Sequence, residues 1–201
     1  MNYKFAYSIG FHPWEDAERH APFVEKISKM FEREESGKTA PFGKALDIGC
    51  GSGVWGINLA KRGWDVTGVD IVDKALQRAQ ERIKKENVNV RLVKDDVTEL
   101  HKIGEGYKLV LDTGTFHGLT VTQRRAMGKA VNNIAAQNAT ILLLVWDPRW
   151  RGPLPGGATR ADIETCFPDW TITHVEPAAD EPEAIYKILK ANEQWHRLCR
   201  K

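Results

Sequence analysis

A glycine-rich segment headed by an acidic residue follows the first buried run of the chain, Asp47-Ile48-Gly49-Cys50-Gly51-Ser52-Gly53. Alternating glycines let a backbone approach a ligand closely, and the helix expected after them presents free N–H groups. Residues 51–56 also match the dinucleotide fingerprint G-x-G-x-x-G, with Asp70 about twenty residues further on. The register disfavours a dinucleotide, because the turn already begins at Gly49 and Val54 stands where that fingerprint needs glycine or alanine.

Acidic residues also follow the next two expected strands. Asp70 ends the strand expected over 64–70, and Asp95 and Asp96 come after the strand expected over 88–93. Right-handed crossovers bring the carboxyl ends of parallel strands to one edge of a sheet, where ligands bind. Each acid alone could equally be a structural residue at a strand end or a helix N-cap, so the inference of a binding role depends on the order of the acids behind the glycine loop.

The set Asp47, Gly49, Gly51 and Gly53 resembles motif I of the class I S-adenosylmethionine-dependent methyltransferases, Asp/Glu-x-Gly-x-Gly-x-Gly, and the resemblance covers about residues 10–200. It implies that the acid and the loop amides meet the methionine portion and the ribose of the cofactor, where a diphosphate would be repelled. Asp70 corresponds to the ribose-binding acid, and Asp96, preferred over Asp95 by spacing, to the adenine contact. The implied contacts of S-adenosylmethionine, and of its product S-adenosylhomocysteine, are Trp14, Asp47, Gly49, Cys50, Gly51, Gly53, Asp70, Ile71, Asp96, Val97 and Asp112.

The segment after the fourth expected strand, Asp112-Thr113-Gly114-Thr115-Phe116-His117, corresponds to the acceptor side of this family. It lacks the Asn/Asp-Pro-Pro-Tyr/Phe of enzymes that methylate amino groups of nucleic acids and proteins. The segment is similar to the Asp-x-Gly-x-Phe-His element of small-molecule methyltransferases, such as those acting on thiols, thiopurines, tellurite or heterocycle hydroxyls. Phe11-His12-Pro13-Trp14 likewise resembles their N-terminal Pro-Trp segment over the cofactor. The substrate contacts expected are Phe11, Phe116, Trp146 and Trp150.

His117 is the expected catalytic residue. Methyl transfer is an in-line displacement, so alignment and desolvation supply most of the acceleration. A protic acceptor must also lose a proton, and a free imidazole has a pKa near neutrality, which suits a general base. A thiolate, halide or carboxylate needs no base, and His117 would then orient the substrate. A purely structural role next to the following helix is the third interpretation.

Strands and helices are expected to alternate along the chain. Hydrophobic patterns predict strands over 45–48, 64–70, 88–93, 107–111, 139–145, 170–175 and 195–198, and helices over 21–35, 53–62, 74–85, 121–136, 159–166 and 182–193. This alternation and the resemblance predict a seven-stranded, mostly parallel Rossmann-like sheet with an antiparallel last strand and helices on both faces. We expect a single domain over 1–201, with 1–43 as a lid or helical segment over the site and 44–201 as the core.

The composition of the chain limits the classes of binding partner that we expect. The chain has 201 residues, and 29 Lys and Arg against 27 Asp and Glu leave a net charge of +2, which does not suggest a nucleic-acid partner. Its 3 cysteines are scattered, and no apolar run approaches the length of a membrane span, so we expect a cytoplasmic protein. The spacing of His and Cys predicts no metal site. A small-molecule acceptor and a monomeric or homodimeric state are expected.

Other functions stay open. An RNA or protein methyltransferase would show a basic docking surface and salt-dependent binding. An NAD(P)-dependent oxidoreductase would bind NADH in place of S-adenosylhomocysteine. A non-catalytic cofactor-binding protein would bind without turnover.

Overall fold

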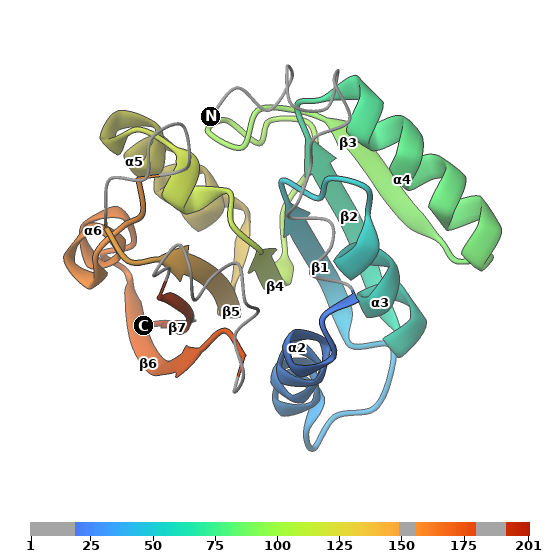
Figure 1. Cartoon of the computed structure of the whole chain (residues 1–201), viewed down its shortest axis with the longest axis horizontal. Helices are drawn as coiled ribbons and strands as arrows, with labels where there is room; N and C mark the ends of the chain where they lie inside the picture. Colours follow the sequence, from blue (N-terminus) through green and yellow to red (C-terminus); the bar gives the residue numbers. More distant parts are fainter. Residues whose placement is uncertain (1–18, 149–155, 180–191) are drawn as a thin grey trace.

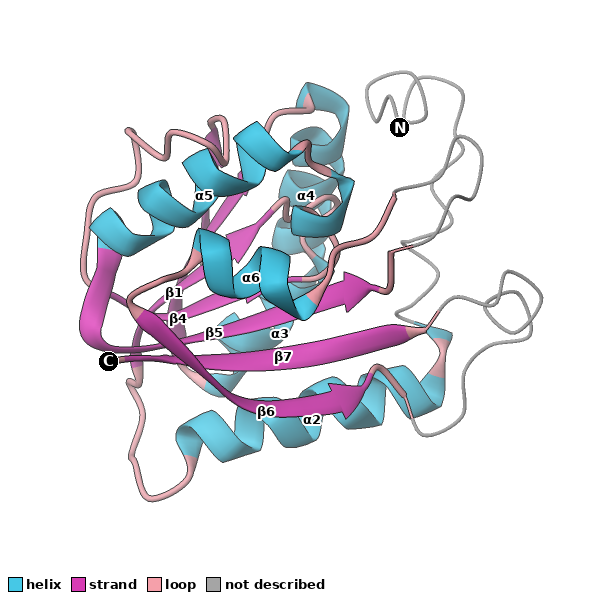
Figure 2. Cartoon of the chain, turned by 90° about the vertical axis from the view of Figure 1, so that its left-hand side faces the viewer, coloured by secondary structure: helices cyan, strands magenta, loops and turns pink. Residues whose placement is uncertain are grey.

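A seven-stranded sheet lies at the centre of the computed structural model, which describes residues 19–148, 156–179 and 192–201 (Figures 1 and 2). Its strands are β1 (Gly43–Ile48), β2 (Trp64–Asp70), β3 (Val90–Lys94), β4 (Tyr107–Asp112), β5 (Ala135–Trp146), β6 (Trp170–Pro177) and β7 (Glu193–Arg200). The order is β3-β2-β1-β4-β5-β7-β6, and β7 alone runs antiparallel to its neighbours. The predicted mostly parallel sheet with an antiparallel last strand is confirmed.

Helices cover both faces of this sheet. They are α2 (Ala21–Glu35), α3 (Val54–Arg62), α4 (Asp73–Glu86), α5 (Val121–Ile134) and α6 (Arg160–Cys166), with a short 3-10 helix, η2, at Phe116–Gly118. Figure 2 shows α5 and α6 over one face, with α2 on the other. The predicted arrangement of helices on both faces is therefore confirmed.

The strand order reverses at β1, and this reversal positions the site. From β1 the chain builds outward through β2 and β3, then crosses back to β4 and β5 on the other side of β1. In open α/β sheets the loops leaving two such neighbouring strands separate and form a ligand-binding crevice. The two loops are residues 49–53 after β1, the β1 loop, and residues 113–120 after β4, the β4 loop.

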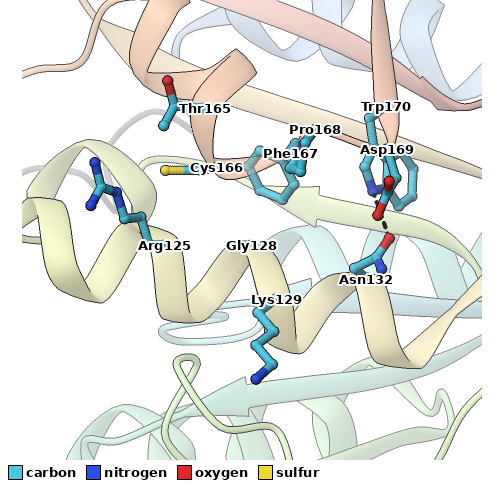
Figure 3. A pocket seen from close by; sticks show the side chains of 10 residues that line it. All are labelled: Arg125, Gly128, Lys129, Asn132, Thr165, Cys166, Phe167, Pro168, Asp169 and Trp170. Atoms are coloured by element: carbon cyan, nitrogen blue, oxygen red, sulfur yellow. Dashed lines mark hydrogen bonds between the residues drawn. The ribbon is translucent and has the colours of Figure 1, made fainter.

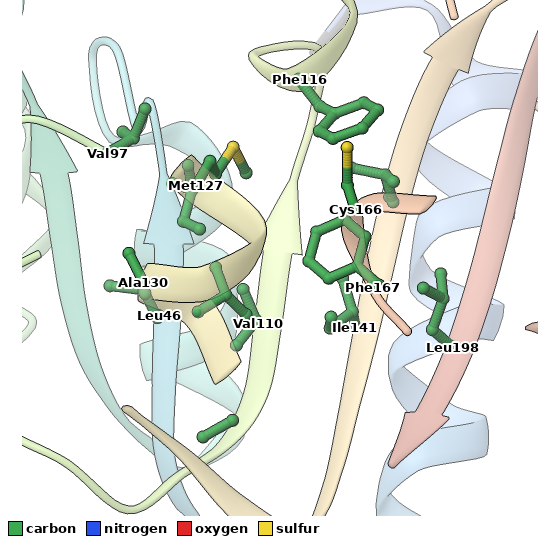
Figure 4. Close-up of a cluster of buried hydrophobic side chains, with 14 of the residues drawn as sticks. Leu46, Val97, Val110, Phe116, Met127, Ala130, Ile141, Cys166, Phe167 and Leu198 are labelled. Carbon is green, nitrogen blue, oxygen red and sulfur yellow. The ribbon is translucent and has the colours of Figure 1, made fainter. Parts of the chain in front are cut away.

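The two faces of the sheet bury separate apolar clusters. Beneath α5 and α6, Phe116 packs against Phe167 with ring centroids 5.7 Å apart, in a cluster that includes Leu198 of β7 (Figure 4). On the other face Ile27 and Phe31 of α2 are fully buried. Burying each such side chain stabilises the fold by roughly 1.5–3 kcal/mol. These clusters hold the sheet and its loops in a fixed arrangement.

Ion pairs fix α2 to the sheet. Arg197 of β7 donates to the buried Glu34 at 2.5 Å and 3.0 Å, and Arg62 of α3 donates to Glu35 at 2.6 Å. Glu176 of β6 accepts from Arg33 of α2 at 2.5 Å, and this hydrogen bond helps to lower the pKa of Glu176 to about 2. Helix α2 is thus tied to three different elements of the core.

Most element bounds differ from the predictions by one or two residues, and the largest differences lie in two places. Helix α5 ends at Ile134 and β5 begins at once at Ala135, although a helix to 136 and a strand from 139 were predicted. Pairing of Ala135 with Tyr107 of β4 overrides the helix propensity of alanine. The helix predicted over 182–193 lies outside the described residues except at its end, where Asn192 is irregular and Glu193 begins β7. No described helix is long and apolar enough to cross a membrane.

Candidate cofactor and acceptor site

The β1 loop folds back over the end of β2. Its three glycines have φ angles of 61°, 53° and 78°, in the left-handed region that costs other residues about 1–2 kcal/mol. The amide of Cys50 donates to Val69 of β2 at 2.9 Å, and the amide of Gly53 donates to Cys50 at 2.8 Å. Helix α3 begins at Val54, and its N-cap residue Gly53 has no side chain to accept from the first amides of the helix.

Asp47 lies beneath this loop and is almost completely buried. Its Oδ2 accepts from the amide of Gly56 at 2.9 Å, and a β-carbon on Gly56 would lie 3.1 Å from the same oxygen. Gly56 therefore serves the close packing of α3 on β1, which gives the last glycine of the apparent dinucleotide fingerprint a structural reason. Burial raises the pKa of Asp47 to about 7, and the negative charges of Asp112 and Asp70 add to the effect.

Two buried polar atoms near the loop lack partners among the described residues. They are Oδ1 of Asp47 and Oγ of Ser52. Leaving such groups unsatisfied costs about 1–3 kcal/mol each, so a polar ligand that reached them would be favoured. A carboxylate oxygen of this kind suits a positively charged group, as the amino acid portion of S-adenosylmethionine supplies, and repels a diphosphate. The residues present therefore fit the implied cofactor.

Asp70 joins the β1 loop to the turn after β2. Its Oδ2 accepts from the amide of Gly51 at 3.0 Å, and its Oδ1 accepts from the amide of Val72 at 2.8 Å. Asp70 is 9% exposed at the carboxyl end of β2, and Ile71 beside it is exposed. The structure thus brings Asp70 to the predicted loop, and its contact with a ribose stays a prediction.

The acids after β3 divide into a structural residue and a more open one. Asp95 is buried and accepts from the amides of Asp96 and Lys102, each at 3.0 Å. Asp96 is half-buried and accepts from the amide and hydroxyl of Thr98 through Oδ1. Val97 is buried in the apolar cluster under α5. This difference in burial favours Asp96 over Asp95 as the adenine contact, which stays a prediction.

Asp112 holds the β4 loop in place through hydrogen bonds to its backbone. This fully buried carboxylate accepts from the amides of Gly114 at 2.8 Å, Thr115 at 2.6 Å and Phe116 at 3.0 Å. Burial raises the pKa of Asp112 to about 6, although these three hydrogen bonds oppose the shift. Asp112 therefore shapes the segment that ends in His117, whatever it also contacts.

His117 and Trp146 lie together at the ends of β4 and β5. Their rings are stacked, with centroids 5.1 Å apart and planes inclined by 20°, and the amide of Trp146 donates to Nδ1 of His117 at 3.3 Å. Phe116 is instead fully buried in the core, as Figure 4 shows, so it lies apart from these two rings. Its role as a substrate contact stays a prediction, whereas Phe11, Trp14 and Trp150 lie outside the described residues.

Arg124 of α5 is a site residue that sequence reasoning missed. Its buried guanidinium donates to the carbonyls of Phe116 at 3.1 Å, His117 at 3.0 Å and Gly157 at 2.6 Å. Burial lowers the pKa of Arg124, opposed by Asp162 3.7 Å away. Arg124 thus ties the β4 loop to the chain before α6. Neither its spacing nor its neighbours in the sequence distinguish it from a solvated arginine.

A separate cavity of about 310 Å³ lies between α5 and the connection from α6 to β6 (Figure 3). Arg125 and Lys129 line it from α5, and Thr165 and Asp169 from the other side. None of the site residues predicted from the sequence lines it. In the described parts of the chain, no group of three or more His, Cys, Asp or Glu side chains could hold a metal ion.

Residues 45–138 match the Methyltransferase domain family. A protein of Geobacillus sp. named as a methyltransferase is 35% identical over 78 residues, 39% of this chain and 29% of that protein. A ubiquinone biosynthesis O-methyltransferase of Psychrobacter cryohalolentis is 35% identical over 68 residues, 32% and 26% of the two chains. A ribosomal RNA small subunit methyltransferase C of Alcanivorax borkumensis is 30% identical over 78 residues, which are 39% of this chain and 24% of that protein. The matched stretches thus span less than a third of these three relatives.

Solved structures have the same fold as this protein over most of the chain. A S-adenosylmethionine-dependent methyltransferase from Clostridium acetobutylicum superposes with a TM-score of 0.72 at 13% identity, over 97% of this chain and 99% of the other. The N-methyltransferase NodS from Bradyrhizobium japonicum, in complex with S-adenosylhomocysteine, superposes with a TM-score of 0.70 at 18% identity, over 89% of this chain and 88% of the other. The family's methyl donor is S-adenosylmethionine. Residues 45–138 thus match a methyltransferase domain, and the whole chain has the fold of solved S-adenosylmethionine-dependent methyltransferases.

Proposed function

We propose that the protein transfers a methyl group from S-adenosylmethionine to an oxygen, nitrogen or sulfur atom of a small aromatic or heterocyclic molecule. The observation that carries this proposal is the pairing of two loops at the reversal point of the sheet. The β1 loop brings the glycine amides together with Asp47 and Asp70, and the β4 loop brings His117 to the neighbouring strand end. One loop suits the cofactor and the other suits the acceptor.

The cofactor would be held by groups whose chemistry matches its parts. Asp47 and Ser52 offer the unpartnered polar atoms for the amino acid portion, Asp70 a carboxylate for the ribose, and Asp96 one for the adenine. Bound S-adenosylmethionine supplies a methyl group activated by positive sulfur. The protein then has to align the acceptor and exclude water, and the fixed β4 loop provides a rigid wall for this.

A small acceptor is supported by the resemblance of the β4 segment and by the relatives. The names of the Psychrobacter O-methyltransferase and of NodS indicate transfer to oxygen and to nitrogen in those proteins. His117 and Trp146 form an aromatic wall at the end of β5, which suits a flat ring. His117 would act on the acceptor either as a general base or as a group that orients it.

The likeness to a ribosomal RNA methyltransferase keeps RNA as the competing substrate. It covers 24% of that protein, and the net charge of +2 here gives no sign of a basic docking surface. Counterion release makes RNA binding fall steeply with salt, whereas a neutral small acceptor is almost insensitive to it. Salt dependence of turnover therefore separates the two substrates.

Release of S-adenosylhomocysteine measures the proposed activity directly. The whole chain is incubated with S-adenosylmethionine and a panel of phenols, aromatic thiols, N-heterocycles and carboxylates, and with total RNA, at low and high salt. We expect turnover with at least one class of small molecule at both salt concentrations. Asp70→Ala should lower turnover when S-adenosylmethionine is below saturation, and Asp65→Ala, a change at the exposed start of β2, should not. Turnover with RNA alone would contradict the proposal.

A further inference from the structure

We propose that the cavity between α5 and the connection from α6 to β6 binds a small molecule that carries a carboxylate or phosphate group on a flat apolar body (Figure 3). Its volume of about 310 Å³ is at the lower end of the range of about 300–1,000 Å³ that is typical of ligand pockets. The lining residues come from 125–132 of α5 and from 165–170, and we call them the anion site. The anion site shares no residue with the β1 loop or the β4 loop, so it does not depend on the proposed function.

Arg125 and Lys129 give the anion site its positive charge. They are four residues apart on α5, so their side chains leave the same face of the helix on successive turns. Both are exposed, and neither forms an ion pair with any residue that the structure describes. Arg124, by contrast, is buried and lies 3.7 Å from Asp162. Like charges at this spacing destabilise a helix, and a bound anion would relieve their repulsion.

Two further cations lie at the opposite wall of the cavity. Lys201 donates from Nζ to the carbonyl of the residue before Asp169 at 2.7 Å, and the guanidinium of Arg200 lies 5.9 Å from the ring centroid of Trp170. Among the lining residues Asp169 alone is acidic, and Figure 3 shows it at the end of the cavity away from Arg125. The balance of charge therefore favours an anion whose charged group lies at the Arg125 end.

The charge of Arg125 acts across the cavity on the facing wall. Cys166, the last residue of α6, is buried in that wall, and burial raises the pKa of its thiol. The positive charges of Arg124 and Arg125 oppose this rise. Gly128 lies on the α5 wall beside Lys129, and a β-carbon there would overlap the carbonyl oxygen of Cys166. Gly128 therefore allows the two walls to meet, within reach of the charge of Arg125.

Aromatic and apolar side chains form much of the remaining lining. Phe167 and Trp170 are buried, and Pro168 between them is exposed. The indole Nε1 of Trp170 donates to Oδ1 of Asn132 at 3.3 Å, as Figure 3 shows. This bond orients the amide of Asn132, whose Nδ2 forms no hydrogen bond within the described residues and can donate to a ligand. A flat ring packed on these side chains, with its anionic group at the cationic end, matches both parts of the lining.

Nuclear magnetic resonance of the indole N–H of Trp170 tests the anion site directly. The whole protein, labelled with ¹⁵N, is titrated with 4-methylbenzoate and with phenyl phosphate, and the Trp170→Phe variant identifies the signal. The control ligand is 4-methylbenzamide, which has the same ring as the benzoate without its charge. We expect the Trp170 signal to shift saturably with at least one anion, and the tighter of the two distinguishes a carboxylate site from a phosphate site. Titrations are run with and without S-adenosylhomocysteine, whose own failure to bind would count against the proposed function alone.

Two double variants test whether the charges of α5 hold the anion. Arg125→Gln with Lys129→Gln removes two positive charges from the cavity, and Lys84→Gln with Lys85→Gln removes the same charge from the exposed end of α4. We expect the first pair to raise the Kd of the anion by about 3–20-fold, because exposed ion pairs contribute modestly, and the second to leave it unchanged. The amide should bind more weakly than the anion by a similar factor. Equal Kd values in all three proteins, equal Kd values for anion and amide, or no saturable shift of Trp170 would each overturn the inference.

All the substituted side chains are exposed, so both double variants should fold, and urea denaturation verifies it.

Discussion

A β-carbon on Gly49 would overlap Oγ1 of Thr115, so that a side chain at this position would force one of the two to move. The β1 loop and the β4 loop are thus in direct contact at this point. Thr115 also donates to the carbonyl of Ile48 at 3.3 Å. The glycine is needed for two reasons, since its φ of +61° is also in the left-handed region. The cofactor side and the acceptor side of the proposed site share this junction.

Gly49→Ala should therefore destabilise the protein more than an alanine at another left-handed glycine. Gly37 is the matched control, because its φ is +72° and nothing lies within 4 Å of the β-carbon it would gain. We expect Gly49→Ala to lower the free energy of unfolding by about 1–3 kcal/mol more than Gly37→Ala, as overpacking does. Urea denaturation measures both. Adding Thr115→Ala should recover part of the difference, and equal losses in the two single variants would argue against the junction.

Asp70→Ala should weaken cofactor binding. The change removes the acceptor for the amides of Gly51 and Val72 and the expected partner of the ribose. Hydrogen bonds to a charged group are worth about 1.5–3 kcal/mol, so we expect a rise of about 10–100-fold in the Kd of S-adenosylhomocysteine. Asp65→Ala, at the exposed start of the same strand, should leave the Kd unchanged. Equal Kd values for Asp70→Ala and the wild type would mean that the ribose lies elsewhere.

Stability of the ligand-free protein should fall as pH rises through neutrality. Burial raises the pKa of Asp47 from 3.8 to about 7, so the folded state holds a proton that the unfolded state has lost. The stability due to this proton is complete below the unfolded-state pKa of 3.8, falls as pH rises above it, and is fully lost once pH has passed the folded-state pKa of about 7. His196, whose pKa burial lowers to about 4, has the opposite effect below the pKa of 6.5 of a free histidine. We therefore compare the wild type with Asp47→Asn between pH 6.5 and 8.

Over that range the free energy of unfolding of the wild type should drop relative to Asp47→Asn by on the order of 1 kcal/mol. Urea titrations of both proteins at several pH values provide the measurement. Asp112, with its pKa raised by burial to about 6, contributes a slope of the same sign in both proteins. Parallel curves for the two proteins would show that Asp47 is already ionised in the ligand-free fold.

Arg124→Met should loosen the β4 loop. The variant leaves the carbonyls of Phe116, His117 and Gly157 without their shared donor. We expect a loss of about 2–4 kcal/mol in the free energy of unfolding and lower turnover, with S-adenosylhomocysteine affinity almost unchanged. Arg125→Met is the control, because this neighbour is exposed. If both variants behave alike, Arg124 does not position His117.

Local patterns were enough to predict the sheet and the β1 loop. Glycine spacing requires a close turn whatever surrounds it, and buried strands alternating with amphipathic helices leave few topologies. The acids at the ends of β1 and β2 were also found, because strand ends of a parallel sheet meet at one edge. Their hydrogen bonds to Gly51 and Gly56 tie them to the predicted loop and helix.

The remaining features depend on contacts between distant residues. Arg124 acts through the carbonyl of Gly157, 33 residues further on, and no local pattern reveals that carbonyl. Phe116 and His117 are adjacent, yet one packs on Phe167 in the core and the other on Trp146 at the strand ends. Aromatic residue types alone cannot distinguish these directions. The early start of β5 similarly depends on the pairing of Ala135 with Tyr107.

Calorimetric titration of the whole chain with S-adenosylhomocysteine, with NADH as the comparison ligand, tests most directly whether the β1 loop holds an adenosyl amino acid. The account predicts saturable binding of S-adenosylhomocysteine that Asp70→Ala weakens and Asp65→Ala does not, and no heat of binding with NADH. Binding of NADH, or no binding of S-adenosylhomocysteine to the folded protein, would contradict it.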